Sequence, residues 1–478
     1  MNPTLLHPNI RLFLLFACAM ALHLCGTWIL PLIDRDEPRF SEASREMRQR
    51  GDWILPTFND APRYDKPPLT YWFQIAFYEL FGENDLAARA HSALFTALTA
   101  LVVYGFCARL YGTGTGWCAA IAFTLSLQVM VQAKAAVADM PMVFFVALAA
   151  WAGWELITAP PNISTRRWWW IFYLALALGF LAKGPIAWLP IGGILIYAWR
   201  KGIPCVNGFM KFHYGIPLML AVVGLWGIPA LIKTHGEFFN IGIGKHVIER
   251  SFAPMEGHGG TGALSYIAML PFYFLTIFPS FLPWSIFSKP LFQRLRARRT
   301  DAELYLLCNI ILTFVIFTLV KTKLPHYTLP AFPLLACLIA PVLVDLRPGQ
   351  FAKLAGGMVA LNLGIAFLLC PWLANHYMVP IKSITASVQI PPDTQSASVD
   401  YDEPSQIWYL RRQLTTWHVL LEAKDATGFL AQPGPRLCVV PADLAKTIPQ
   451  LPTWERTPFA GHDLANGKNM SLVMILKR

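Results

Sequence analysis

Charged residues follow the first long apolar block of the chain and return before a pair of prolines. Residues 34–39 read Asp-Arg-Asp-Glu-Pro-Arg, and residues 64–68 read Tyr-Asp-Lys-Pro-Pro. Arginine can hold a phosphate through two parallel hydrogen bonds and lysine as a point charge, whereas a carboxylate can accept a proton or orient an attacking group. The candidates for such chemistry are Asp36, Glu37, Arg39, Tyr64, Asp65 and Lys66.

Further ionisable residues interrupt the apolar blocks downstream. An ionisable group near lipid costs about 2.5–3.5 kcal/mol even on lenient insertion scales, so such groups usually have partners or a function. The alternative for any single lysine is a side chain that reaches from a helix end to the headgroups. This set contains Lys134, Asp139, Lys183, Lys321, Lys323, His326 and Tyr327.

Residues 245–258 add Lys245, His246, Glu249, Arg250 and His258. The two histidines are either ordinary loop residues or metal ligands. A metal held by one carboxylate and one histidine would need water or phosphate oxygens to complete its shell.

The amino-acid composition indicates the class of protein in which these residues are placed. Of 478 residues, 55% are hydrophobic and 14% are charged, whereas about 25% are charged in a typical soluble protein. The apolar residues come in long blocks, which excludes a disordered, coiled-coil or ordinary soluble protein and predicts a polytopic membrane protein. The net charge of +11 is spread along the chain, so anionic lipid, and not nucleic acid, is the expected partner.

A window of about 19 residues gives eleven apolar blocks. They lie near 10–32, 90–108, 115–133, 140–158, 168–182, 185–199, 214–232, 263–287, 304–320, 324–344 and 354–373. Basic residues almost without acids gather in alternate gaps, at Arg109, Arg166, Arg200, Lys211, Arg294 and Arg347 among others. These gaps are predicted to be cytoplasmic, together with the N-terminus, so the candidate residues share the outer face.

Two other segments have a distinct character. Residues 41–50 could form a short interfacial helix closed by Gly51, or a solvated run of charge, and Pro67-Pro68 can open a second helix. In the tail, residues 437–440 and 472–476 suit strands, and residues 404–413 and 442–448 suit helices. The predicted domains are a membrane domain over 1–373, with its first outer loop at 33–85, and an α/β domain outside the membrane over 374–478.

The outer face is therefore expected to carry cations and one or two carboxylates, with apolar helices beneath them. Such a face would match a molecule with a phosphate at the interface and a long hydrocarbon tail.

Several short motifs in the sequence also resemble those of a known family. Residues 36–40 (DEPRF) with Glu42 and Arg45, 51–53 (GDW), 65–69 (DKPPL), 181–185 (LAKGP) and 324–327 (LPHY) resemble the ArnT-like aminoarabinose transferases. That family belongs to the GT-C glycosyltransferases, which use polyprenyl-phosphate sugars, and is distantly similar to protein O-mannosyltransferases.

The resemblance implies a GT-C fold with 11 to 13 transmembrane helices, two juxtamembrane helices in the first loop and a small periplasmic α/β C-terminal domain. It implies undecaprenyl-phosphate-linked aminoarabinose as the donor and a lipid A phosphate as the acceptor, with inversion at the anomeric carbon. By this resemblance, Asp36 and Asp139 match catalytic acidic positions, and Arg39 and Lys66 match residues that contact the donor phosphate. Lys183 and Arg250 are assigned to the same set of phosphate-binding residues. A divalent ion, zinc or magnesium, is implied at Asp65 with His246 or His258.

The implied setting is the bacterial inner membrane, with the active site facing the periplasm and the chain acting as a monomer. Within the enzyme class, another sugar, such as galacturonic acid, glucosamine or a hexose, could go to lipopolysaccharide core, another glycan or protein. A different class is a lipid or sugar transporter, which should show paired half-repeats with broken helices; the sequence has no such repeat. A third alternative makes the tail the working part, although an anchor for it would need only one helix.

Overall fold

The computed structural model of the chain describes residues 7–160, 163–242, 244, 263–347, 349–464 and 466–478. It divides into two compact units, each built from separate stretches of the sequence. The first contains residues 1–24, 64–73 and 89–362, and the second contains residues 25–63, 74–88 and 363–478. The domain boundary predicted at residue 373 stays a prediction.

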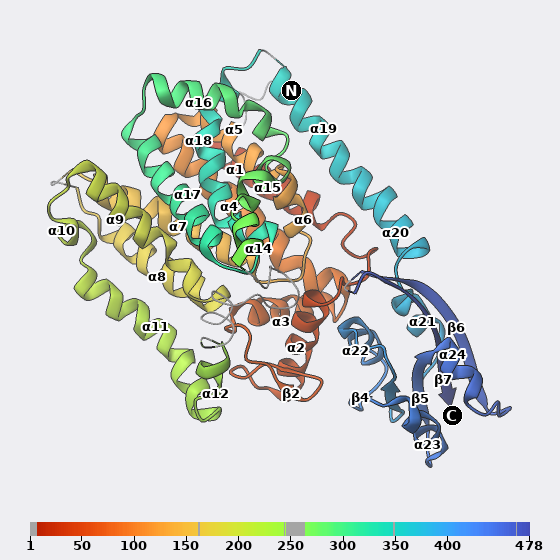
Figure 1. The fold of residues 1–478 in the computed structure, drawn as a ribbon. Helices are drawn as coiled ribbons and strands as arrows, with labels where there is room; N and C mark the ends of the chain where they lie inside the picture. The colour runs from red at the N-terminus through yellow and green to blue at the C-terminus, as the bar shows by residue number, and fades with distance from the viewer. Residues whose placement is uncertain (1–6, 161–162, 243, 245–262, 348, 465) are drawn as a thin grey trace. The chain divides into compact units, whose positions relative to one another are not determined.

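The first unit is helical, because its sequence consists of apolar runs separated by short polar turns (Figure 1). Its long helices include α4 (Asp85–Tyr111), α7 (Asp139–Thr158), α8 (Arg166–Lys183), α11 (Phe212–Lys233), α17 (Asp301–Leu319) and α18 (Phe332–Val344). Its shorter ones include α1 (Pro8–Leu24), α5 (Thr113–Thr124), α6 (Leu127–Gln132), α9 (Leu189–Lys201), α10 (Val206–Met210), α12 (Glu237–Phe239), α14 (Ala263–Ala268), α15 (Phe272–Ser280), α16 (Ser288–Ala297) and α19 (Gln350–Gly364). Short 3₁₀ turns are η2 (Pro185–Trp188), η4 (Trp284–Phe287) and η5 (Pro325–Ala331).

Within the described residues, six helical stretches are long and apolar enough to cross a membrane, or seven if a bent pair counts as one span. The chain is therefore a multi-pass membrane protein, as predicted, although the number of eleven to thirteen spans is not confirmed. Two predicted blocks differ in shape. The first helix ends at Leu24, not near residue 32, since Gly26 has a φ of +78°. Block 263–287 is bent by 108° between Leu264–Ser280 and Trp284–Ala297, where Pro283 interrupts the helix.

Close helix packing in this unit depends on small residues. Helix α7 packs along α8, α8 along α11, and α9 along α17. A Cβ on Gly153 of α7 would lie 2.3 Å from Ile194 Cδ1, and one on Gly193 of α9 would lie 2.0 Å from Asn309 Oδ1. The two glycines thus leave room for the Ile194 and Asn309 side chains between neighbouring helices.

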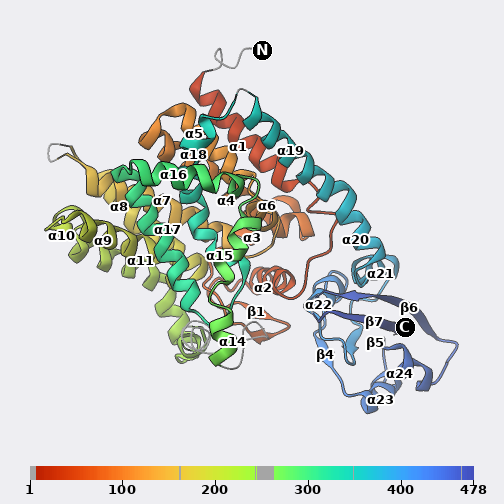
Figure 2. The ribbon, with the colours of Figure 1, turned by 45° about the horizontal axis from the view of Figure 1, so that its top comes forward.

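The second unit contains a five-stranded sheet in the order β4-β3-β5-β7-β6. Its strands are β3 (Gln395–Ser398), β4 (His418–Leu420), β5 (Arg436–Pro441), β6 (Trp454–Asp463) and β7 (Lys468–Lys477), and β6 and β7 form the long hairpin in Figure 2. Strands β3, β4 and β5 are parallel, and β7 is antiparallel to β5 and β6. Helices α22 (Pro404–Leu410), η7 (Ala423–Asp425), α23 (Ala426–Ala431) and α24 (Ala442–Thr447) accompany the sheet, and η6 (Ile365–Leu369), α20 (Cys370–His376) and α21 (Ile381–Ser387) precede it.

The α/β character predicted for the tail is confirmed, with both predicted strands and both predicted helices present. Strand β5 is central, and its residues 437–440 are buried, as a short continuous apolar run indicates. The core beneath the sheet includes Val440, Leu430 and Ile475.

The same unit holds the first loop, with α2 (Asp36–Arg50), β1 (Thr57–Phe58), β2 (Ala61–Pro62) and most of α3 (Leu69–Phe81). Helix α2 ends at Gly51, as predicted, with a φ of +65°. The solvated alternative for residues 41–50 is wrong, because residues 41–47 are all buried.

Buried charges of α2 pair with cations from inside the same unit, and we call Glu42, Arg45, Glu46 and Arg411 the α2 charge cluster. Arg45 Nη1 lies 2.6 Å from Glu42 Oε2, and Arg411 Nη1 lies 2.7 Å from Glu42 Oε1 and 3.1 Å from Glu46 Oε1. Arg45 also stacks over the Trp408 ring at 3.8 Å. Paired ions and an aromatic face let a charged helix become buried.

Candidate active site

A cavity of about 690 Å³ opens in the first unit, and four chain segments bring charged side chains to one end of it. Asp139 is the first residue of α7 and Lys183 the last of α8, and these two helices pack along each other. A helix N-terminus favours a carboxylate and a C-terminus favours a cation, so both ends support the pair. Lys183 Nζ lies 2.6 Å from Asp139 Oδ1.

The other two segments are the ends of turns. Asp65 and Lys66 precede the two prolines that open α3, and Lys66 Nζ donates a hydrogen bond to the Asp65 carbonyl oxygen at 3.2 Å. His326 and Tyr327 come from η5, directly before α18. We call the end lined by these residues the charged end of the cavity: Asp65, Lys66, Asp139, Lys183, His326 and Tyr327.

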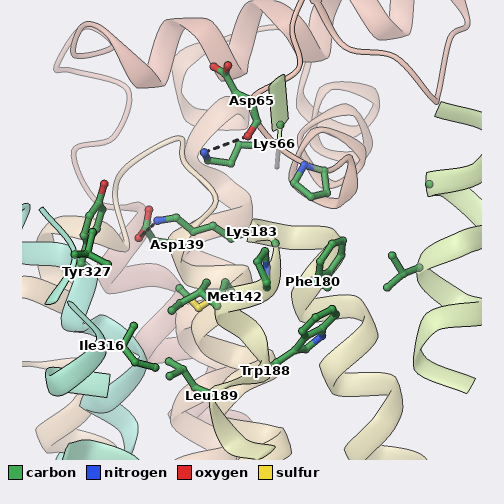
Figure 3. Close-up of a pocket in the computed structure, with 18 of the residues that line it drawn as sticks. Asp65, Lys66, Asp139, Met142, Phe180, Lys183, Trp188, Leu189, Ile316 and Tyr327 are labelled. Carbon is green, nitrogen blue, oxygen red and sulfur yellow. Dashed lines mark hydrogen bonds and ion pairs between the residues drawn. The ribbon is translucent and has the colours of Figure 1, made fainter. Parts of the chain in front are cut away.

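Apolar side chains line the rest of the cavity. Figure 3 shows Met142, Phe180, Trp188, Leu189 and Ile316 together on the side away from Asp65 and Lys66. Helices α7, α8, α9, α11, α12 and α17 and the turn η2 supply this wall, and its other residues include Val223, Trp226, Leu231, Phe238 and Leu312. The cavity therefore offers a charged end and a long apolar body to a single ligand.

The pair of Asp139 and Lys183 is only partly shielded. The Asp139 side chain is 5% exposed and the Lys183 side chain 17% exposed. An ammonium in this position has hydrogen-bond donors left for a second anion, because Lys carries three and one points at Asp139. The arrangement can hold a phosphate oxygen beside a buried carboxylate.

Tyr64 anchors the segment that carries Asp65 and Lys66. Its hydroxyl donates a hydrogen bond to Glu237 Oε2 at 3.0 Å, and its ring meets Phe238 edge to face at 5.7 Å. Burial raises the pKa of Tyr64, and the hydrogen bond to Glu237 raises it further, so the hydroxyl stays a donor. The sequence analysis did not select Glu237 as a site residue. The feature that could have identified it is its position as a lone acid just beyond the end of a membrane helix.

Two predicted lysines serve as helix caps. Lys323 Nζ donates to the carbonyl oxygens of Phe317 and Thr318 at the end of α17, and burial lowers the pKa of Lys323 to about 8. Lys134 Nζ donates to the Leu22 and His23 carbonyl oxygens at the end of α1. Neither lysine is among the residues that line the cavity, and neither is Lys321.

The remaining candidates lie elsewhere. Asp36, Glu37 and Arg39 belong to the second unit, in the first turn of α2, where Asp36 is exposed and Glu37 Oε2 accepts a hydrogen bond from the Ile33 amide at 2.7 Å. His246, Arg250 and His258 lie outside the described residues. Among the residues that are described, no group of three or more His, Cys, Asp or Glu could hold a metal.

The chain is similar to known proteins both in sequence and in fold. A family described as dolichyl-phosphate-mannose-protein mannosyltransferase matches residues 65–226. An undecaprenyl phosphate-alpha-4-amino-4-deoxy-L-arabinose arabinosyl transferase from Erwinia tasmaniensis is 28% identical over 398 residues, which cover 79% of this chain and 69% of the relative. A second such transferase from Sodalis glossinidius is 30% identical over 383 residues, covering 75% and 65%.

A solved structure shares the fold of this chain. The crystal structure of ArnT from Cupriavidus metallidurans bound to undecaprenyl phosphate matches with a TM-score of 0.78 at 19% identity, and the match covers 98% of both chains. The chain is similar in sequence to these arabinosyl transferases and has the fold of ArnT from Cupriavidus metallidurans. Its fold is the helical GT-C fold with a small sheet domain at the C-terminus.

The chain spans 59 to 69% of the length of the first curated relatives it matches. The family match places the predicted motifs Asp65-Lys66 and Lys183 within the aligned residues 65–226, together with Asp139.

Proposed function

We propose that this chain is an integral-membrane glycosyltransferase that moves 4-amino-4-deoxy-L-arabinose from undecaprenyl phosphate to a lipid A phosphate. The cavity carries the proposal, because it joins two lysines and a buried carboxylate to a long apolar body. A polyprenyl phosphate has this same division into a charged head and a hydrocarbon tail. The ArnT fold likeness and the names of the curated relatives support the donor.

The charged end suits the departure of a phosphate. As the bond between the sugar and the phosphate breaks, negative charge grows on the phosphate oxygen, and the ammonium groups of Lys66 and Lys183 would stabilise it. The bond from the acceptor oxygen to the anomeric carbon forms as the phosphate leaves with its electron pair. One in-line displacement of this kind inverts the anomeric carbon.

Asp36 is proposed to orient the acceptor. A phosphate monoester is already ionised near neutral pH, with a second pKa of about 6, so its attack needs little base catalysis. A sugar or protein hydroxyl would need a base. Asp36→Asn should therefore reduce transfer to a phosphate acceptor modestly and nearly abolish transfer to a hydroxyl acceptor, and equal losses with both would contradict this role.

The proposal includes a setting in the bacterial inner membrane, with the active site on the periplasmic face, the N-terminus in the cytoplasm and a monomeric chain. It also includes 11 to 13 spans, with shorter apolar helices such as α1 and α9 crossing beside the longer ones, and two juxtamembrane helices, α2 and α3. The distribution of basic loops supports this orientation.

A divalent ion, zinc or magnesium, also remains a proposal. Asp65 lines the cavity, while His246 and His258 belong to residues that the structure leaves undescribed, so the described donors alone are too few for a metal. An ion held there would supply positive charge near the donor phosphate. Lys66 and Lys183 supply such charge without it.

The test is transfer of labelled aminoarabinose from undecaprenyl phosphate by the purified protein in detergent, paired with mass spectrometry of lipid A from cells with and without the gene. A mass step of one aminopentose that needs the gene is expected. Unchanged lipid A would contradict the acceptor, and turnover with another lipid-linked sugar, such as galacturonic acid, would favour the alternative donor. Movement of lipid across liposomes without turnover would indicate a transporter.

A further inference from the structure

The segment that carries Asp65 and Lys66 has little regular structure to hold it. Residues 63–67 belong to no helix or strand, and they lie between β2 and α3. Side-chain contacts must therefore set the position of the Lys66 ammonium. An ammonium held loosely would bind phosphate less well, because ordering it costs conformational entropy at the moment of binding.

Three contacts to this segment come from residues 237–242, immediately after α11. Glu237 accepts the hydrogen bond of the Tyr64 hydroxyl, and Phe238 packs against the Tyr64 ring. At Gly242 the backbones meet, since a Cβ there would lie 2.8 Å from the Tyr64 carbonyl oxygen. A hydrogen bond, a ring contact and a close backbone approach together define one orientation of Tyr64.

The residues that make these contacts are themselves anchored. The Phe238 amide donates to the Thr234 hydroxyl at 3.2 Å, and the Phe238 ring, which is buried, meets Trp226 edge to face at 5.0 Å. Trp226, Phe238 and Gly242 also line the cavity. Helix α12 and the residues that follow it to Gly242 thus form part of the cavity wall and also support Tyr64.

We propose that Glu237 is a positioning residue that acts through Tyr64 to hold the Lys66 ammonium at the charged end of the cavity. The inference rests on the proposed function, because it assigns Lys66 a phosphate to bind. Glu237 itself is exposed and does not line the cavity, so it would affect the ligand only through Tyr64 and Lys66.

The experiment measures binding of undecaprenyl phosphate to the purified full chain. Tyr64→Phe and Glu237→Ala should each weaken binding about threefold to tenfold, as loss of one hydrogen bond does. Glu237→Gln keeps an acceptor for the tyrosine hydroxyl and should restore most of the affinity. Glu155→Gln, which alters a carboxylate paired with Arg109 elsewhere in the first unit, is the matched control and should bind like wild type.

A second set of variants separates positioning from general destabilisation. In a Lys66→Gln background, Tyr64→Phe should cause no further loss, since its effect passes through the ammonium. Losses that add in the double variant, or single variants that bind like wild type, would overturn the inference. Failure of the wild-type chain to bind undecaprenyl phosphate would instead count against the proposed function, so the two failures are distinguishable.

Discussion

The charged end of the cavity and the α2 charge cluster contain the same kinds of residue in different states. In the α2 charge cluster, Glu42 has two arginines within 2.7 Å, and the side chains of Glu42, Arg45 and Glu46 have no exposed surface. At the charged end of the cavity, Lys183 pairs with the carboxylate of Asp139 and stays 17% exposed beside an open volume.

This difference distinguishes structural from functional charge. Charges that neutralise one another in a filled interior have no room for a ligand, so their main effect is on folding and on which segments pack together. Charges that border a hollow can exchange a protein partner for a ligand. The comparison assigns stability to the α2 charge cluster and anion binding to the cavity, and each assignment can be broken by substitution.

The largest effect is expected from Arg411→Met in the α2 charge cluster. The change leaves the Glu42 and Glu46 carboxylates buried with one cation fewer, which typically costs about 3–5 kcal/mol. Unfolding in detergent, followed by tryptophan fluorescence, should show a large loss of stability. Lys446→Met, which removes an exposed pair with Asp443, is the control and should melt like wild type. Equal melting of both variants would contradict a structural role for the cluster.

Lys183→Gln should have the opposite profile, with a large loss of activity and a smaller loss of stability. Removing one cation that stabilises a leaving phosphate is expected to slow transfer about 100-fold, or about 2.7 kcal/mol. Asp139 keeps favourable interactions with Lys66 and His326, so the fold should tolerate the change better than Arg411→Met.

Sugar-transfer rates and melting curves of the same preparations would check this. Lys201→Gln, which removes an exposed pair with Asp301, is the matched lysine control and should leave the rate unchanged. Lys183→Arg should recover part of the activity. A Lys183→Gln variant that transfers sugar at the wild-type rate would place the lysine with the structural charges.

The sequence predicted only part of this contrast between structural and functional charges. Apolar length predicted helices such as α7, α11 and α17, and alternation of basic loops put Asp65, Asp139, Lys183 and His326 on one face, where the cavity joins them. The burial of α2 was invisible because its partner Arg411 stands more than 350 residues away in the chain. The apolar wall was equally hidden, since Phe180 or Leu189 looks like any other membrane residue until the helices pack.

A third group of ionisable residues, in the second unit, can be compared with the other two by measuring how stability depends on pH. Asp34 and Glu403 are carboxyls with few cations nearby: Asp34 accepts a hydrogen bond from the Ser405 amide at 2.7 Å, and Glu403 has Arg35 at 3.7 Å. Burial, with a smaller contribution from the charge of Asp463, raises the pKa of Asp34 to about 7. Burial, followed by the charges of Asp34 and Asp463, raises the pKa of Glu403 to about 8.

The sign of the stability effect follows from these directions. The folded chain holds the two protons more tightly than the unfolded chain, whose carboxyls titrate near pH 4, so stability falls as the pH rises from about 4 to 8. The melting temperature should therefore be roughly 2–5 °C higher at pH 6 than at pH 8.5. Glu403→Gln, which keeps a neutral group of the same size, should flatten this dependence, whereas Glu422→Gln at an exposed site should leave it unchanged. Stability that rises towards pH 8.5 would contradict the raised pKa values of Asp34 and Glu403.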